Sequence, residues 1–237
     1  MRVAALADVH GNAPALEAVL AELAQEDVDL VVFCGDLTWG PLPQETLALV
    51  RGMTVETRFV RGNGDRMVGA DVGARGTWIA AQHGEADTAF VNGFDRAVTV
   101  KVDGLGPTRF VHGSPRSDEE CVTERTPAER VSEFMAGVPE RVVVTAHIHV
   151  SYDRAVGDVR LLSPGSVGLP YEGRRGARWA LLGPGVDFRR TDYDVERAAG
   201  LFRASGIPEV EKDLGLLLEP PTRDEVIEDA ERRVFAG

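Results

Sequence analysis

Short apolar runs alternate with amphipathic stretches over the first third of the chain. The runs that predict buried strands are residues 2–7, 29–35 and 56–61. Helical spacing of apolar positions predicts helices over 12–26 and 44–51, the first with Asn12 as N-cap and Pro14 in its first turn. Strand, helix and strand in this order predict parallel strands joined by right-handed crossovers, which is an α/β arrangement.

From residue 97 the pattern changes to mostly short strands. The predicted strands are residues 97–102, 108–112, 141–146, 159–162, 177–182 and 186–190. A capping box at 126–129, with Pro127 at the first helical position, predicts a helix over 127–136. Another helix is predicted over 194–205, ended by Gly206. Residues 67–95 predict no definite element, because glycine and aspartate interrupt their periodicity.

The end of the chain predicts one more helix. A second capping box, Thr222 with Glu225, opens it, and its apolar stripe consists of Val226, Ile227, Ala230 and Val234. We therefore expect a domain over 1–209 and a C-terminal extension over 210–237. This extension packs either on the domain or on a partner subunit of a homodimer.

Composition and charge limit the classes of partner and site that fit this chain. The chain has 237 residues and a formal net charge of −12, which disfavours nucleic-acid polymers and anionic membranes as partners. Its two cysteines, Cys34 and Cys121, lack the spacing of a disulfide framework or a thiolate zinc site. Asp8 and His10 come too early for a signal-peptide core, and no apolar stretch is long enough to span a membrane. We expect a cytoplasmic protein.

Side chains that bind metal ions follow five of the predicted strands. They are Asp8, His10, Asp36, Asn63, His112, His147 and His149, and they include four of the five histidines. Ligands of open α/β sheets bind at the carboxyl ends of the strands. Imidazole and carboxylate suit Mn, Zn or Fe, and seven ligands are too many for one four-coordinate ion. They suit two ions that clamp the oxygens of an in-line displacement.

Each motif has an ordinary structural interpretation when it is considered alone. Asp8 and His10 can be a polar strand end, and His147 and His149 one polar face of a half-exposed strand. Asn63-Gly64 is a strong hairpin signal. The joint pattern outweighs these interpretations, since independent turns would not consume nearly all the histidines of the chain.

The five motifs in order resemble the calcineurin-like metallophosphoesterases, specifically their small bacterial and archaeal phosphodiesterase-like branch. They are DVHGN (8–12), GDLTWGP (35–41), GNGD (62–65), VHGSP (111–115) and AHIH (146–149). The resemblance implies an α/β fold, a four-layer α/β/β/α sandwich of two mixed β-sheets flanked by helices, with the metal site at the strand carboxyl ends. It also implies hydrolysis of a phosphomonoester or phosphodiester by a metal-bridging hydroxide.

The resemblance further implies a role for each ligand residue. One ion would be held by Asp8, His10 and His149, the other by Asn63, His112 and His147, with Asp36 as the bridge. The cofactors would be two divalent ions, with Mn²⁺ favoured and Fe, Zn or Ni as alternatives. The hydroxide would act next to Asp36, Asn63 and His112.

Two positions depart from the family pattern. Ala146 replaces a glycine, which exchanges one small residue for another. Gly64 replaces the His or Cys that the family uses as an acid, and three interpretations stay open. In the first, His83 supplies the acid, although a surface histidine is the favoured interpretation of that residue. In the second, the reaction needs no acid. In the third, the chain is a non-catalytic metal-binding scaffold or a protein-interaction module.

The substrate is weakly specified by the sequence. The helix that Asn12 opens and the side chain of Arg66 are candidates for binding an anion. Arg116, Arg174 and Arg175 are further candidates, but a solvated surface charge is the favoured interpretation of each arginine. Tyr171 can stack on a base or fill a gap. Nucleotides, dinucleoside polyphosphates and small phosphodiesters all fit these residues.

Overall fold

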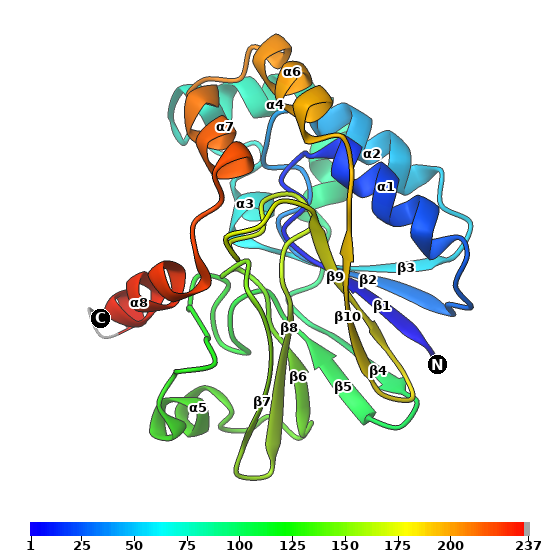
Figure 1. The fold of residues 1–237 in the computed structure, drawn as a ribbon, viewed down its shortest axis with the longest axis vertical. Coiled ribbons are helices and arrows are strands. Elements are labelled where there is room, and N and C mark those ends of the chain that lie inside the picture. Colours follow the sequence, from blue (N-terminus) through cyan, green and yellow to red (C-terminus); the bar gives the residue numbers. More distant parts are fainter. Residues whose placement is uncertain (235–237) are drawn as a thin grey trace.

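Two five-stranded sheets form the centre of the protein. The computed structural model describes residues 1–234, and the two sheets lie one above the other in Figure 1. The first sheet has the order β10-β9-β1-β2-β3 and the second β4-β5-β6-β8-β7. The first comprises β1 (Val3–Leu6), β2 (Leu30–Cys34), β3 (Glu56–Val60), β9 (Ala177–Leu182) and β10 (Val186–Thr191). The second comprises β4 (Val98–Val102), β5 (Gly106–Phe110), β6 (Val142–Val144), β7 (Ser151–Val156) and β8 (Val159–Pro164).

The pairing of the strands is mixed in both sheets. As the sequence predicts, β1 pairs with β2 and β2 with β3 in parallel. In the second sheet β6 lies parallel between β5 and β8, and the edge strands β4 and β7 are antiparallel. The carboxyl ends of β1, β2 and β3 therefore meet at one edge of the first sheet.

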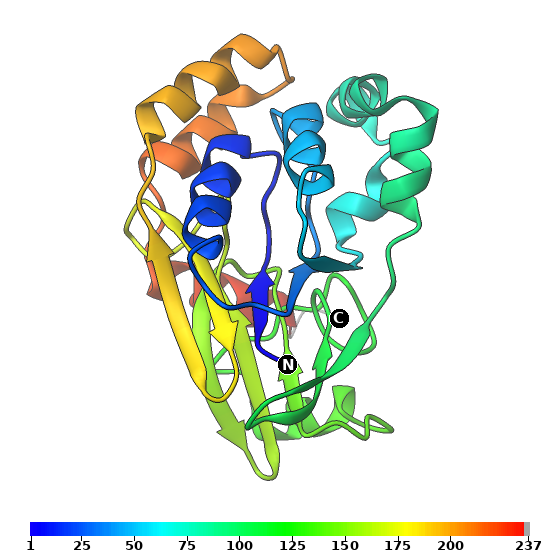
Figure 2. The same cartoon turned by 90° about the vertical axis from the view of Figure 1, so that its right-hand side faces the viewer.

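Helices cover the outer faces of both sheets (Figures 1 and 2). They are α1 (Ala13–Leu23), α2 (Pro43–Arg51), α3 (Asn63–Met67), α4 (Gly73–Asn92), α5 (Ala128–Phe134), α6 (Val195–Ser205), α7 (Val210–Leu218) and α8 (Arg223–Val234). Alternate residues of each strand serve different layers. In β1, Val3 and Ala5 pack between the sheets, whereas Ala4 and Leu6 pack under the helices. The predicted four-layer sandwich is confirmed.

The C-terminal segment joins the two halves of the molecule. Leu214 and Leu217 of α7 pack with α6, while Ile227 and Ala230 of α8 are buried against the second sheet. The capping box at the start of α8 is present, since the Thr222 N–H donates to Glu225 Oε2 at 2.9 Å. The predicted stripe therefore packs on its own chain; the side chain of Val234 lies outside the described residues. None of the helices within residues 1–234 has the length and apolar character needed to cross a membrane.

Some predicted elements were wrong or incomplete. Residues 67–95 consist largely of α4, which is interrupted at Gly84 where φ is 65°. Strand β7 was not predicted. Thr126 does not cap α5, which begins with Pro127 as its N-cap; the Thr126 hydroxyl instead donates to Glu231 in α8 at 2.9 Å.

Candidate metal centre

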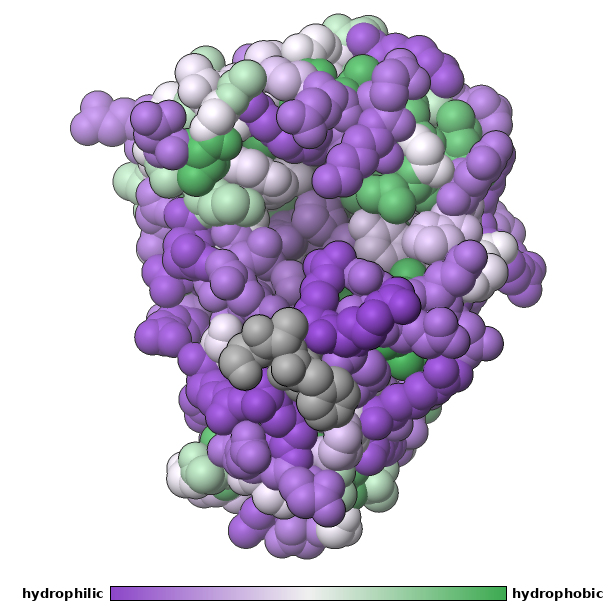
Figure 3. All heavy atoms as spheres, turned by 90° about the vertical axis from the view of Figure 1, so that its left-hand side faces the viewer, coloured by the Kyte–Doolittle hydropathy of each residue, from purple (hydrophilic) through white to green (hydrophobic). Residues whose placement is uncertain are grey.

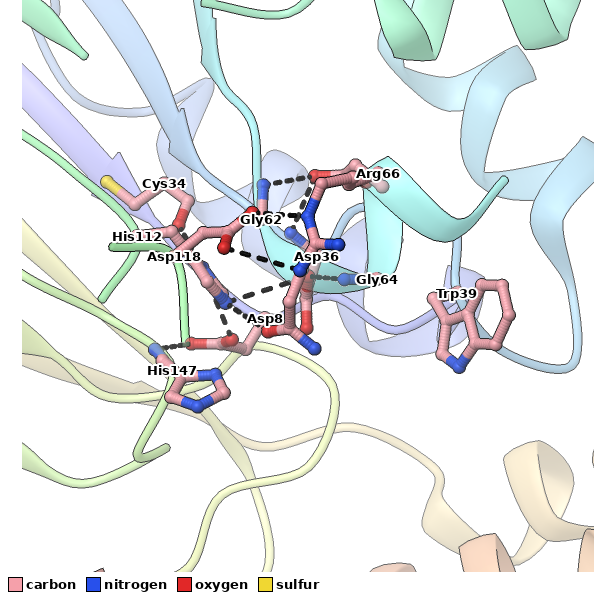
Figure 4. A network of polar contacts seen from close by, with 12 residues as sticks. Asp8, Cys34, Asp36, Trp39, Gly62, Gly64, Arg66, His112, Asp118 and His147 are labelled. Carbon is pink, nitrogen blue, oxygen red and sulfur yellow. Dashed lines mark hydrogen bonds and ion pairs between the residues drawn. The ribbon is translucent and has the colours of Figure 1, made fainter. Parts of the chain in front are cut away.

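The ends of five strands bring the predicted ligand residues together. Asp8, Asp36 and Asn63 follow β1, β2 and β3 of the first sheet. His112 follows β5 and His147 follows β6 of the second sheet. Figure 4 shows residues from both sheets converging on one point. The site is therefore built between the two sheets, not on one of them.

The ligand atoms form two compact groups. One group is Asp8, His10 and His149, and the other is Asp36, His112 and His147; within each, the ligand atoms lie within 4.8 Å of one another. Asn63 joins the second group, because its Oδ1 lies 3.0 Å from His112 Nε2.

Asp36 lies between the two groups. Its Oδ2 is 3.6 Å from His10 Nε2, and its Oδ1 is 3.6 Å from His112 Nε2. Each carboxylate oxygen therefore faces a different group, which is the arrangement that a bridging ligand requires.

Hydrogen bonds to carbonyl oxygens orient three of the imidazole rings. Nδ1 of His10 lies 3.1 Å from Trp39 O, Nδ1 of His112 lies 2.9 Å from Cys34 O, and Nδ1 of His149 lies 2.7 Å from Leu169 O. A carbonyl only accepts, so each Nδ1 carries a proton, and in the neutral ring each Nε2 presents a lone pair.

Two of those lone pairs face each other. His10 Nε2 and His149 Nε2 are 3.1 Å apart. Neutral imidazoles with both Nε2 atoms unprotonated would repel at that distance, whereas a cation next to both would be bound by both. The buried Asp8 Oδ1 has no hydrogen-bond partner among residues 1–234 and lies 3.4 Å from His149 Nε2. An orphaned carboxylate oxygen beside paired lone pairs fits a divalent cation.

Backbone strain is concentrated at the same residues. Among the described non-glycine residues, positive φ angles occur at Asp8, His10, Asp36, His147, His149 and Glu209, and five of these six are in the candidate site. Such conformations cost about 1–3 kcal/mol each and persist where the surroundings impose them.

Electrostatics in the site couple the carboxylates to the rings. Burial raises the pKa of Asp8, but the neighbouring His149 and His112 outweigh it and lower the pKa overall. Burial lowers the pKa of His147 to about 4, with the charge of His112 acting in the same direction. For His112, burial is outweighed by Asp36 and Asp8, which raise its pKa. His147 therefore stays neutral and able to bind a cation well below neutral pH.

Asp65 holds the loop that carries Asp36, a role that the sequence did not reveal. Its carboxylate accepts the N–H groups of Asp36 at 2.8 Å, Leu37 at 2.9 Å and Gly62 at 2.9 Å. Burial and the nearby Asp36 raise the pKa of Asp65 to about 7. Gly64 completes this contact, because its N–H donates to Asp36 Oδ1 at 2.7 Å. Asn63-Gly64 is thus the start of α3 and not a hairpin turn.

Several predicted substrate and acid residues lie elsewhere. The interpretation of His83 as a surface histidine was wrong: it is buried, with Nδ1 2.8 Å from Ile79 O and Nε2 2.9 Å from Thr38 Oγ1. Asn12 is also buried, and its amide nitrogen donates to Gly168 O at 2.8 Å. Neither residue lines the cavity at the site.

The other candidate anion binders are engaged by neighbouring groups. Arg66 pairs with Asp118 at 2.9 Å and with Glu119 at 2.6 Å. Tyr171 stacks on the ring of His149, with centroids 4.3 Å apart and planes 19° apart. Arg116 and Arg175 also pair with carboxylates. None of these arginines lines the cavity.

A cavity of about 650 Å³ opens over the two groups. Its floor includes His10, Asp36 and Asn63, and residues of α7 and α8 form part of its wall. Figure 3 views this side of the molecule and shows a hollow with a mainly hydrophilic rim. The C-terminal helices therefore belong to the surroundings of the site, and a cavity of this size suits a small ligand.

Comparison with known proteins decides the family. A model of the calcineurin-like phosphoesterase superfamily domain matches residues 1–182. The chain belongs to this superfamily. The comparison with curated proteins found no match.

Solved structures of similar fold extend over most of the chain. A hypothetical protein from Pyrococcus horikoshii OT3 has a TM-score of 0.81 at 19% identity, covering 93% of this chain and 99% of that one. A metallophosphoesterase from Sphaerobacter thermophilus has a TM-score of 0.74 at 25% identity, covering 92% and 99%. Vps29 from Entamoeba histolytica complexed with Zn²⁺ has a TM-score of 0.50 at 18% identity, covering 82% and 100%.

Proposed function

We propose that this chain is a dinuclear metal-dependent hydrolase of phosphoester bonds. The observation that carries the proposal is the position of Asp36 between the two ligand groups. Its Oδ2 lies 3.6 Å from His10 Nε2 in one group, and its Oδ1 lies 3.6 Å from His112 Nε2 in the other. Membership of the calcineurin-like phosphoesterase superfamily supports the reaction class.

The residues present fit two divalent ions. Asp8, His10 and His149 would hold one, Asn63, His112 and His147 the other, and Asp36 would bridge them. Bound ions would supply Lewis acidity toward the phosphoryl oxygens and lower the pKa of a coordinated water. The donor set of imidazole, carboxylate and amide favours Mn²⁺, with Fe, Zn or Ni as alternatives.

The protein itself orients these groups. The carbonyls of Trp39, Cys34 and Leu169 hold the Nδ1 protons, so the Nε2 atoms point into the site. The Gly64 N–H holds one oxygen of Asp36. Because Gly64 brings no side chain and His83 lies outside the cavity, we propose a reaction without a protein general acid. Substrates with good leaving groups are then hydrolysed fastest.

A non-catalytic metal-binding scaffold is the alternative function. The observation that favours it is again Gly64, since the position that the family pattern gives to an acid has no side chain. The complete set of ligand residues favours the enzyme. A cytoplasmic location, a homodimer and the division of the chain at residue 209 stay predictions.

The experiment combines metal analysis with a phosphoester panel. The purified protein is analysed for bound metal and assayed with Mn²⁺ on 4-nitrophenyl mono- and diesters and on nucleotides. We expect about two ions per chain and metal-dependent turnover. Asp36→Asn should lose both, whereas Asp71→Asn, at an exposed residue, should retain both.

The outcomes separate the two functions. Turnover that survives a chelator and Asp36→Asn contradicts the proposed mechanism. Two bound ions without turnover on the whole panel support the scaffold instead.

A further inference from the structure

Outside the two ligand groups, the cavity wall combines apolar and charged residues. The apolar residues that line it include Trp39, Met67, Leu169, Leu216, Pro221 and Val226. They come from both sides of the opening, since Met67 lies in α3 whereas Leu216 lies in α7. The part of a ligand that extends away from the ions therefore meets hydrocarbon and the aromatic rings of Trp39 and Tyr171, of which Tyr171 is already stacked on His149.

The charged groups of the wall do not form a second phosphate site. The cations that line the cavity are Arg75, Lys212 and Arg233. Arg75 pairs with Asp213 at 2.9 Å, and Arg233 pairs with Asp229 at 2.6 Å. Within residues 1–234, only Lys212 of the three has no ion pair.

The carboxylates of the wall also disfavour the binding of a second phosphate group. Glu209 and Glu225 also line the cavity. Their negative charge opposes a further anionic group on the outer part of a ligand. The cavity therefore favours a substrate with one phosphate group, at its reacting end, over a polyphosphate.

Trp39 lies beside the bridging carboxylate. It follows Asp36 by three residues, and its Cβ would lie only 2.7 Å from a Cβ added at Gly64. The far end of its indole lies against α4, 3.5 Å from a Cβ added at Gly76. Figure 4 shows its ring beyond Gly64, next to the polar network. The ring is half-buried and lines the cavity, so part of it faces a ligand.

We propose that Trp39 determines substrate specificity by stacking on a planar aromatic group of the substrate, such as a nucleobase. A base that stacks on an aromatic side chain gains an affinity that alanine substitution measures as roughly tenfold. The inference rests on the proposed hydrolysis, because it assigns the organic part of the same phosphoester.

Two diesters with the same leaving group test the inference kinetically. They are thymidine 5′-(4-nitrophenyl) phosphate and methyl 4-nitrophenyl phosphate. We expect the wild type to prefer the nucleoside diester in kcat/KM, mainly through KM. Trp39→Leu should reduce that preference roughly tenfold, because only the nucleoside diester carries a base. Trp39→Phe should restore much of it, since the aromatic ring is retained.

Fluorescence gives a readout that does not need turnover. In rapid mixing, AMP should quench the tryptophan emission of the wild type, and ribose 5-phosphate should not. Trp39→Phe should abolish the quenching. Trp78→Phe is the matched control, because Trp78 is also half-buried but does not line the cavity, and it should retain the quenching.

Three results would overturn the inference. The first is an equal effect of Trp39→Leu on both diesters, and the second is quenching that survives Trp39→Phe. The third is an affinity for adenosine 3′,5′-bisphosphate well above that for AMP, removed by Lys212→Ala, which would assign a second phosphate site. Quenching as expected without hydrolysis would sink the proposed function but not this inference. Metal-dependent hydrolysis in which Trp39→Leu does not change the preference between the two diesters would support the proposed function and contradict this inference.

Discussion

Gly64 lies against two groups that leave no room for a side chain. A Cβ at this position would lie 2.7 Å from Trp39 Cβ and 2.9 Å from Asp36 Oδ1. We therefore expect Gly64→His to reduce metal binding and to give no gain in activity, although it restores the family pattern. Displacing Asp36 or Trp39 should destabilise the fold by about 1–3 kcal/mol, measured by denaturant unfolding.

Gly200 provides the control for that substitution. It lies in α6, and an added Cβ there meets no described residue within 4 Å. Gly200→Ala should be neutral or stabilise by up to about 1 kcal/mol. An active, fully metal-loaded Gly64→His variant would show that the loop relaxes and that position 64 accepts an acid.

Asp65 stabilises the loop of Asp36 through three backbone N–H groups. An asparagine has only one acceptor oxygen, so at least one of the three donors would lose its partner. We expect Asp65→Asn to lower the free energy of unfolding by about 1–3 kcal/mol and to weaken metal binding. Metal titration followed by calorimetry measures both, with the exposed Asp71→Asn as control. Unchanged affinity would show that the loop needs no such support.

The ligand residues could be predicted from the sequence because each directly follows an apolar strand. The strand period and the topology of parallel sheets then bring them to one edge. The surroundings could not be predicted in the same way. His83 stands in the polar stretch QHGEAD, yet α4 buries it against Thr38. Asn12 was interpreted correctly as an N-cap, but its amide is engaged by Gly168 and Tyr193, which follow more than 150 residues later.

At the scale of elements, local sequence signals were sufficient to predict a helix or strand where the tertiary packing favours the same structure. Helix α6 has its predicted end at Gly206, with a φ of 77°. Helix α4 was not predicted because Gly84, at a φ of 65°, interrupts the helical spacing of its apolar residues. The segments on both sides of Gly84 are nevertheless helical, since tertiary contacts stabilise them. Helix α7 was not predicted, since its burial depends on α6, a separate helix.

The pair of Arg75 and Asp213 fixes α7 over the site. Two parallel hydrogen bonds of 2.9 and 3.0 Å join the side chains, and Arg75 also donates to Pro208 O at 3.2 Å. The side chains are only 17% and 9% exposed, so Arg75→Ala would leave a nearly buried carboxylate without a partner. We expect a loss of stability of about 3 kcal/mol, faster hydrogen exchange in α7, and a raised KM.

The pair of Arg197 and Glu17 is the control for α7. It joins two helices as well, but its side chains are 60% and 58% exposed. Arg197→Ala should therefore cost less than about 1 kcal/mol. Equal effects of the two substitutions would mean that the Arg75 pair has no special role in holding α7.

At the scale of the whole molecule, the candidate site crosslinks the two sheets. In each ligand group, residues that follow strands of the first sheet face histidines that follow strands of the second. Without cations, the buried carboxylates and strained backbones of these residues oppose folding. Bound ions would offset that cost and would act only on the folded state, because unfolding separates the two groups.

Metal removal should therefore lower the thermal stability of the whole fold. A free ion concentration of 100 times the dissociation constant adds about 2.7 kcal/mol to the free energy of unfolding. For a chain of this size that is on the order of 5–10 °C in Tm. We expect EDTA to lower Tm by at least this amount and Mn²⁺ to restore it, measured by calorimetry. Asp36→Asn should lose most of the metal-dependent shift, and Asp71→Asn should keep it. A Tm that does not respond to metal would contradict two ions bound between the sheets, since such ions must stabilise the arrangement that brings their ligands together.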